Sequence, residues 1–307
     1  MSSRFIERQK MKSSVMSFPN RGKWGNSNWR GNASGHVYKD IFEQIKPQVF
    51  VDPMVGSGTS VEVAQEMGIE AHGLDLHQGF NAIRHSILEK VGKESCLVLS
   101  HPPYGGMIVY SGNVWGCEAH PDDLSRCIDD NDFHEKMQLV MLNQRTATRP
   151  GGYYGTIIGD WRRGGVYTSY QAEIIARLPR DELASVIIKT QHNCVSDARS
   201  YGHMALPRIM HEYVLIFQKK AKPVLVLLRQ MACEQQARLN GTWKTILQNV
   251  LMMMGGKAEM KSIYEKVAEN APERLSLNVH WREKVRQTLN SNPKFFASDE
   301  RGVWCLA

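Results

Sequence analysis

The sequence has 307 residues, of which 42% are hydrophobic, so it can enclose one full domain and a small accessory domain. Its formal net charge is +7 at pH 7, and Lys and Arg are spread along the chain, which suits a surface that meets a polyanion. No run approaches the roughly 18 apolar residues of a membrane span, the N-terminus lacks a signal-peptide core, and the six cysteines form no C-x-x-C pair. We therefore expect a cytoplasmic protein without a disulfide framework or a metal site.

The first two thirds of the chain predict an α/β domain. Residues 1–17 are basic and without periodicity, which is typical of a flexible arm, and residues 18–35 are dense in Gly, Asn and Trp, which indicates an ordered loop. Short apolar runs then alternate with helical stretches, a pattern of strand–helix–strand units in a mostly parallel sheet. The expected helices span 38–45, 59–67, 80–91 and 132–148, and the expected strands span 49–51, 70–74, 96–99, 154–158, 184–189 and 212–218. The last two strands are expected to be antiparallel because only a loop joins them.

The last third of the chain predicts a second, smaller domain. A boundary is expected near residues 219–223, followed by a helical connector. Helices are expected over 243–254, 259–269 and 279–289, with a turn at Pro272 and a hairpin over 295–306. The predicted division is an arm over 1–17, a main domain over 18–220, a connector over 221–240 and a second domain over 241–307.

A glycine-rich turn follows the first long strand of the main domain. From Asp52 to Thr59 the sequence Asp-Pro-Met-Val-Gly-Ser-Gly-Thr breaks the strand and opens a helix, whose N–H groups then face a polar or anionic ligand. The next strand ends near Asp75, whose carboxylate can accept hydrogen bonds from the two hydroxyls of a ribose. Together these features predict an adenosine-containing ligand at the carboxyl edge of the sheet.

A second motif, Ser-His-Pro-Pro-Tyr, follows the strand over 96–99. Its two prolines keep the backbone extended and leave the carbonyl of Pro102 free to accept a hydrogen bond from an amino group. Tyr104 offers a flat face for a base that has been flipped out of a duplex. A neutral His101 accepts one hydrogen bond and a protonated one accepts none, so an activity that uses His101 as acceptor is expected to fail at acid pH.

Both motifs resemble those of the amino-group DNA methyltransferases, which methylate N6 of adenine or N4 of cytosine. The resemblance implies a Rossmann-like class I methyltransferase fold, S-adenosylmethionine as cofactor, no metal, and DNA as partner, with the protein near the nucleoid. It also implies that the loop over 18–35 closes over the methionine end of the cofactor. The catalytic residues that it implies are His101, Pro102, Pro103 and Tyr104. The cofactor-binding residues that it implies are Asn32, Ser34, Asp52, Pro53, Gly56, Ser57, Gly58, Thr59, Asp75 and Leu76.

His101 departs from this family, whose tetrapeptide usually begins with Asp, Asn or Ser. The leading hypothesis is transfer of a methyl group to N6 of a flipped adenine, with N4 of cytosine as the alternative. A non-catalytic regulator that binds S-adenosylmethionine and DNA is a third interpretation. An RNA base methyltransferase is disfavoured because no RNA-binding module is recognisable, and a cytosine C5 enzyme because the chain has no Pro-Cys pair. The sequence leaves the choice between monomer and homodimer open.

Three further segments are candidates for contact with DNA. Arg162 and Arg163 lie in a basic, aromatic stretch interpreted as a loop, with a solvated surface loop as the equal alternative. Tyr110 and Trp115 lie in a stretch that either lines a flipped-base pocket or probes a groove. Residues 243–306 resemble a winged helix-turn-helix domain, with a protein-binding winged helix as the alternative. In that resemblance the reading helix carries Arg282, Lys284 and Arg286.

Overall fold

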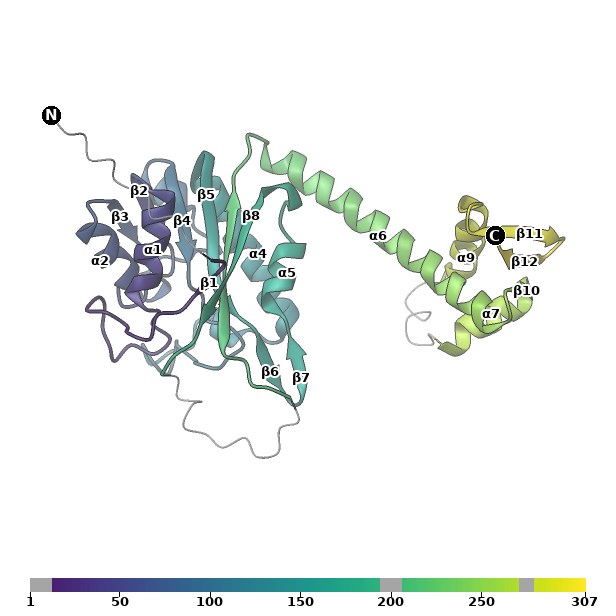
Figure 1. Cartoon of the computed structure of the whole chain (residues 1–307), viewed down its shortest axis with the longest axis horizontal. Coiled ribbons are helices and arrows are strands. Elements are labelled where there is room, and N and C mark those ends of the chain that lie inside the picture. The colour runs from purple at the N-terminus through teal and green to yellow at the C-terminus, as the bar shows by residue number, and fades with distance from the viewer. Residues whose placement is uncertain (1–12, 194–205, 271–278) are drawn as a thin grey trace. The chain divides into compact units, whose positions relative to one another are not determined.

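The structure is a computed structural model that describes residues 13–193, 206–270 and 279–307. It contains two compact units, Met1–Val224 and Leu225–Ala307. The first unit is built on a seven-stranded sheet in the order β1-β8-β9-β5-β4-β2-β3 (Figure 1). These strands are β1 Val15–Met16, β2 Val49–Asp52, β3 Glu70–Gly73, β4 Ser95–Ser100, β5 Thr148–Gly159, β8 Leu183–Thr190 and β9 His211–Gln218.

The sheet is mostly parallel. Strands β3, β2, β4 and β5 run in one direction, and β9 pairs antiparallel with both β5 and β8. The expected antiparallel pairing of the last two strands is therefore confirmed. The mostly parallel, Rossmann-like sheet that the sequence predicted is confirmed as well.

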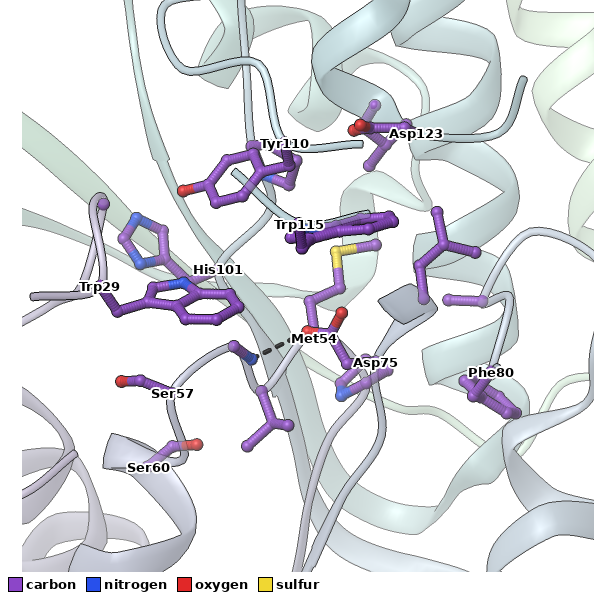
Figure 2. A pocket seen from close by; sticks show the side chains of 18 of the residues that line it. Trp29, Met54, Ser57, Ser60, Asp75, Phe80, His101, Tyr110, Trp115 and Asp123 are labelled. Atoms are coloured by element: carbon purple, nitrogen blue, oxygen red, sulfur yellow. Dashed lines mark hydrogen bonds between the residues drawn. The ribbon is translucent and has the colours of Figure 1, made fainter. Parts of the chain in front are cut away.

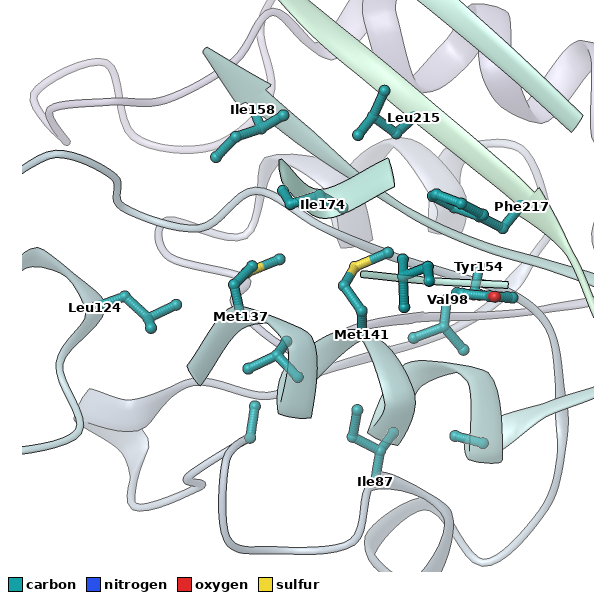
Figure 3. Close-up of a cluster of buried hydrophobic side chains, with 14 of the residues drawn as sticks. Ile87, Val98, Leu124, Met137, Met141, Tyr154, Ile158, Ile174, Leu215 and Phe217 are labelled. Atoms are coloured by element: carbon teal, nitrogen blue, oxygen red, sulfur yellow. The ribbon is translucent and has the colours of Figure 1, made fainter. Parts of the chain in front are cut away.

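Two hydrophobic clusters cover the two faces of this sheet. Successive residues of a strand point to opposite faces, so Val98 of β4 packs in one cluster while Leu97 and Leu99 pack in the other. The first cluster contains side chains of α3, α4 and α5 (Figure 3), and the second contains side chains of α1 and α2. Their bounds are α1 Gly35–Ile45, α2 Thr59–Glu66, α3 Ile87–Val91, α4 Asp130–Ala147 and α5 Tyr170–Ala176, with short 3₁₀ turns at Leu76–Gln78, Leu124–Arg126 and Arg180–Glu182.

The N-terminal arm and the segment after β3 differ from the sequence-based expectation. Strand β1 lies in the stretch expected to be a flexible arm, because it pairs parallel with β8 and buries Met16. The helix expected over 80–91 is confined to α3. The Asn81 side chain accepts a hydrogen bond from the N–H of Ile83 (3.0 Å) and donates one to Asp122 (2.8 Å), which competes with helical pairing until Ser86 caps α3.

The basic stretch around Arg162 is a hairpin, where a loop was expected. Strands β6 Trp161–Arg163 and β7 Val166–Thr168 pair antiparallel around Gly164 and Gly165. Both glycines have positive φ (56° and 81°), the conformation that a two-residue hairpin turn requires.

In its described residues, the second unit contains three helices and a three-stranded antiparallel sheet in the order β10-β12-β11. The expected connector and the helix after it form one continuous helix, α6, in which Thr242 donates a hydrogen bond to the carbonyl of Arg238 (3.0 Å). The helix expected over 279–289 corresponds to α9, which begins at Trp281 and ends at Ser291. The turn expected at Pro272 lies outside the described residues. The elements are α6 Val224–Met253, β10 Lys257–Glu259, α7 Met260–Asn270, α9 Trp281–Ser291, β11 Phe296–Glu300 and β12 Val303–Leu306. Among the described helices, none is long and apolar enough to cross a membrane.

A buried ion pair joins α4 to the end of the sheet. The Arg145 guanidinium donates to both carboxylate oxygens of Glu182 (2.8 and 2.7 Å) and to the carbonyls of Lys220 and Lys222 (3.0 and 3.1 Å). The Tyr154 hydroxyl donates to the same carboxylate (2.7 Å). The side chains of Arg145 and Glu182 are 1% and 0% exposed, so water cannot solvate either charge if its partner is removed.

Arg145→Met is expected to lower the free energy of unfolding by about 3–5 kcal/mol, because it leaves the Glu182 carboxylate buried without its partner. Urea denaturation followed by circular dichroism measures the change. Arg177→Met is the matched control: it removes a partly exposed pair with Glu173 and is expected to cost about 1 kcal/mol or less. An equal loss of unfolding free energy in the two variants would contradict a special contribution of the buried Arg145–Glu182 pair.

Candidate active site

The carboxyl ends of β2, β3 and β4 border one cavity of about 830 Å³, including the part that is open to solvent (Figure 2). Ligands of open α/β sheets bind at this edge. Nine of the residues that the sequence analysis singled out line the cavity: Asn32, Pro53, Gly56, Ser57, Thr59, Asp75, Leu76, His101 and Pro103. The structure therefore brings the two sequence motifs together at one site.

The glycine turn after β2 forms the floor of the cavity. Gly56 and Gly58 have φ of 51° and 90°, and a Cβ atom added to Gly56 would lie 3.0 Å from the Trp29 indole nitrogen. The turn therefore requires glycine for its backbone and for the close approach of Trp29. It leads into α2, and Thr59 and Ser60 at the start of this helix line the cavity. The first N–H groups of a helix have no partner within it and can bind a polar or anionic ligand.

Asp52 lies beneath this turn and does not line the cavity. Its side chain accepts hydrogen bonds from the N–H of Met54 (2.9 Å) and the hydroxyl of Ser60 (2.6 Å), and the residue is 1% exposed. Burial raises the pKa of Asp52 to about 6, against the lowering by these two hydrogen bonds. Asp52 therefore supports the turn. The prediction that it contacts the cofactor is wrong for this structure, because it does not line the cavity.

Asp75 lies on the cavity wall just after β3. One carboxylate oxygen accepts a hydrogen bond from the Gly56 N–H (2.8 Å), and the other lies 2.7 Å from His77 Nδ1 and 3.2 Å from the His77 N–H. An ionised carboxylate has about four acceptor positions, and three of them face these groups, so one position remains for a hydroxyl group in the cavity. The same carboxylate fixes the glycine turn and faces the ligand space.

Aromatic side chains from three separate loops form the walls. Trp29 lies 5.4 Å from His77 and 6.4 Å from Tyr110, and His77 lies 5.9 Å from Trp115, measured between ring centroids. The sequence analysis left the roles of Tyr110 and Trp115 open, and it missed the contribution of Phe80. Two tryptophans in a Gly- and Asn-rich loop were a usable signal, but one of them, Trp24, is buried in the core, and only Trp29 reaches the cavity.

Two of the four predicted catalytic residues line the cavity and two do not. His101 and Pro103 line the cavity, and Pro102 is buried. Tyr104 does not line it: its hydroxyl donates a hydrogen bond to Glu212 (2.8 Å), and its ring lies 6.2 Å from that of Tyr170. In this structure the face expected to stack on a base is turned toward the protein.

A buried acidic residue that the sequence analysis missed, Glu212 of β9, lies behind His101. Its carboxylate oxygen Oε1 lies 3.7 Å from Nε2 of His101, and its Oε2 pairs with the Lys189 ammonium. Burial acts to raise the pKa of Glu212, but Lys189 and His101 outweigh it and hold this pKa well below its usual range. No local motif marks Glu212, because it lies more than 100 positions from His101 in the chain.

Of the other predicted residues of the first unit, Ser34, Gly58, Arg162 and Arg163 do not line the cavity. Ser34 caps α1 by accepting the N–H of His36 (3.3 Å), while Asn32 accepts the hydroxyl of Thr59 (2.7 Å) and so attaches the 18–35 loop to the glycine turn. The hairpin carries Arg162 and Arg163, and α9 of the second unit carries Arg282, Lys284 and Arg286. Within the described ranges, no group of three or more His, Cys, Asp or Glu is arranged to hold a metal ion.

Asp52→Asn is expected to flatten the pH dependence of stability. Because folding raises the pKa of Asp52, its contribution is fully present below about pH 4 and is lost as pH rises through about 6. The variant should therefore gain about 3 kcal/mol of stability relative to wild type when the pH is raised from 4 to 7.5. Urea denaturation of both proteins at both pH values measures this gain. The same stability difference between variant and wild type at pH 4 and pH 7.5 would contradict a raised pKa of Asp52. The asparagine amide can still accept the Met54 N–H and donate to Ser60.

No protein-family model matches the chain. No curated protein matches it either. Similar solved structures include TrmN from Thermus thermophilus, at 14% identity over 62% of this chain and 50% of that one, with a TM-score of 0.38. Another protein of Thermus thermophilus, assigned as a DNA modification methylase and solved with S-adenosyl-L-methionine, is 21% identical over 47% of this chain and 54% of its own, with a TM-score of 0.30. The Thermus thermophilus 16S rRNA N2 G1207 methyltransferase RsmC, solved with AdoMet and guanosine, is 13% identical over 64% and 45%, with a TM-score of 0.32.

The chain spans about half of the length of each of these three proteins. All three identities are 21% or lower, so their substrates are not carried over to this chain.

Proposed function

We propose that the chain is an S-adenosylmethionine-dependent methyltransferase that acts on the exocyclic N6 of a flipped adenine in DNA. The observation that carries this proposal is one cavity shared by the glycine turn, the Asp75 carboxylate and the His101-Pro102-Pro103 segment. The first two features suit a nucleoside cofactor, and the third suits an amino group.

The cavity walls fit the three parts of S-adenosylmethionine. Asp75 accepts a ribose hydroxyl, the glycine turn and the start of α2 receive the methionine carboxylate, and Phe80 provides an apolar face for the adenine. When bound, the cofactor supplies a methyl group on a positively charged sulfur. The residues of the chain hold it beside His101, which Figure 2 shows across the drawn pocket from Phe80.

His101 and the Pro102 carbonyl orient the amino group that receives the methyl group. An amino nitrogen conjugated to a base ring is a poor nucleophile, and two acceptors that take its protons favour a tetrahedral nitrogen with an exposed lone pair. No covalent attachment of the base to the protein is required. The acceptor at His101 must be a neutral imidazole nitrogen.

The second unit supports DNA as the partner. Its order of elements, α6-β10-α7-α9-β11-β12 in the described residues, with the three strands in one sheet, is compatible with a winged helix-turn-helix domain. In that arrangement α9 lies in the major groove and the β11–β12 turn forms the wing. Arg282 lies 5.3 Å from the Trp281 ring, so its charge is held at the start of α9. The cationic hairpin over 161–168 would add phosphate contacts from the first unit.

Lys284→Ala combined with Arg286→Ala is expected to weaken DNA binding about 10-fold at roughly 100 mM salt and to reduce the salt slope of log K by up to about 2. The loss of two phosphate contacts would have this effect on any sequence. Fluorescence anisotropy with labelled duplex measures it, and S-adenosylmethionine affinity should stay unchanged. Arg229→Ala, an exposed cation of α6, is the matched control. A loss equal in both proteins would exclude α9 as the reading helix.

The direct test incubates the chain with unmethylated DNA and methyl-labelled S-adenosylmethionine, digests the DNA, and identifies the labelled nucleoside by mass spectrometry. Label in N6-methyladenine supports the proposal. Label in N4-methylcytosine replaces adenine by cytosine as the target. Measurable binding of cofactor and DNA without any label would contradict the enzyme and favour the regulator.

A further inference from the structure

The buried cluster behind His101 is built by strands that are distant in sequence. Lys189 of β8 and Glu212 of β9 face each other in the antiparallel register, and Gly159 of β5 is the partner of Glu212 on its other side. A Cβ atom on Gly159 would lie 2.4 Å from the Tyr104 hydroxyl oxygen. The missing side chain therefore lets the segment after β4 reach across β5 to Glu212.

Glu212 is surrounded by donors. Its side chain is 8% exposed, and those of His101 and Lys189 are 13% and 11% exposed. Oε2 is taken by the Lys189 ammonium, while Oε1 accepts the Tyr104 hydroxyl and faces His101 Nε2 at 3.7 Å. Hydrogen bonds of catalytic groups are often long without substrate and shorten in the complex. A carboxylate is an acceptor only, so a hydrogen bond between the two groups requires the proton on the imidazole nitrogen.

We propose that Glu212, itself fixed by Lys189, is a positioning residue that keeps the proton of His101 on Nε2 and leaves Nδ1 as the acceptor for the substrate amino group. This inference rests on the proposed methyl transfer and extends it to how a histidine serves in place of the usual acceptor. A hydrogen bond on one imidazole nitrogen decides the role of the other.

Two carboxyl groups, Glu212 and Asp52, act on the charge of His101. Lys189 balances Glu212, so the pair presents no net charge to the ring. Asp52, on β2, is the other of these carboxyl groups. Burial raises its pKa to about 6, so above that pH its charge favours the imidazolium. Tyr38 of α1 stays protonated, since burial first and then Asp52 and Glu212 raise its pKa well above the usual value. An unbalanced Glu212 would favour the imidazolium, which accepts no hydrogen bond.

Glu212→Gln tests the proposal because Lys189 has donors only. Lys189 is expected to hold the amide oxygen, which turns the amide NH₂ group toward His101 and moves the imidazole proton to Nδ1. Nitrogen-15 NMR of histidine-labelled full-length protein at about pH 8 reports this tautomer directly, with His101→Asn to assign the signal. We expect Nε2–H in wild type and Nδ1–H in the variant, together with a roughly 100-fold loss of kcat at unchanged cofactor affinity.

The double variant Glu212→Gln/Lys189→Met is the matched rescue. Without the ammonium, the amide can turn its oxygen back to His101, so the Nε2–H tautomer should return and kcat should recover to within about 10-fold of wild type. A purely structural role of Glu212 would give a second loss instead. If Glu212→Gln does not fold, Lys189→Met alone should move the acid limb of the pH–rate profile to higher pH, because Glu212 then favours the imidazolium.

Either Nδ1–H in wild type, or an unchanged tautomer in Glu212→Gln, would overturn the proposal. The NMR result does not depend on catalysis. The expected tautomers in a protein that transfers no methyl group to DNA would therefore sustain the positioning role and overturn the proposed function. Methyl transfer by wild type with the Nδ1–H tautomer would sustain the proposed function and overturn the positioning role.

Discussion

His101→Phe is expected to reduce kcat for methyl transfer by roughly 100- to 1,000-fold while the affinity for S-adenosylmethionine changes less than about 3-fold. The phenyl ring keeps the bulk of the cavity wall but accepts no hydrogen bond from the amino group. Single-turnover transfer of labelled methyl to DNA measures the rate, and equilibrium binding of labelled cofactor measures the affinity. An unchanged rate would remove His101 from the reaction.

His101→Asn is the matched control for this prediction. Its amide oxygen accepts a hydrogen bond at every pH, so activity should return to within about 10-fold of wild type. Wild type should lose activity as pH falls, because the imidazolium has no lone pair to offer, whereas the asparagine variant should keep its rate. The same acid loss in both proteins would assign it to another group.

Asp75→Ala is expected to weaken S-adenosylmethionine binding by roughly 100- to 1,000-fold. A hydrogen bond from a ribose hydroxyl to this charged acceptor contributes about 1.5–3 kcal/mol, and part of the loss comes from the Gly56 N–H, which loses its acceptor. Isothermal titration calorimetry measures the affinity. The effect combines a lost ligand contact with a loosened turn.

Asp75→Asn separates these two contributions. The amide oxygen can still accept the Gly56 N–H, so the turn should hold, while one ribose hydroxyl loses its charged acceptor. We expect an affinity about 10-fold below wild type. If Asn were as damaging as Ala, the charge of Asp75 and not its support of the turn would dominate.

The sequence predicted the parts of the site that are short and contiguous. The turn from Pro53 to Thr59, the strand end at Asp75 and the segment beginning at His101 each acquire their shape from a few neighbouring residues. Glycine gives the positive φ, proline the extended backbone, and a strand end the exposed carboxylate. Because parallel strands end at one edge, their meeting in one cavity followed from the α/β pattern.

The sequence did not predict which side chains would reach that cavity from a distance. Trp24 and Trp29 belong to one loop, yet the first is buried against α1 and the second lies on the glycine turn. Tyr104 was expected to face the substrate and instead bonds to Glu212. Each outcome depends on contacts across the sheet that local composition does not encode.

By itself, the sequence of this protein determined the fold class, the glycine turn and the motif around His101, because local backbone preferences and hydrophobic periodicity act within a few residues. Only the tertiary structure decided that β9 runs between β5 and β8. That arrangement places Lys189 and Glu212 behind His101, and it leaves Gly159 as the gap through which Tyr104 reaches them. The physical reason is that a strand's neighbours in a sheet are set by packing of the whole domain, and a buried charge is tolerated only where that packing supplies its partner.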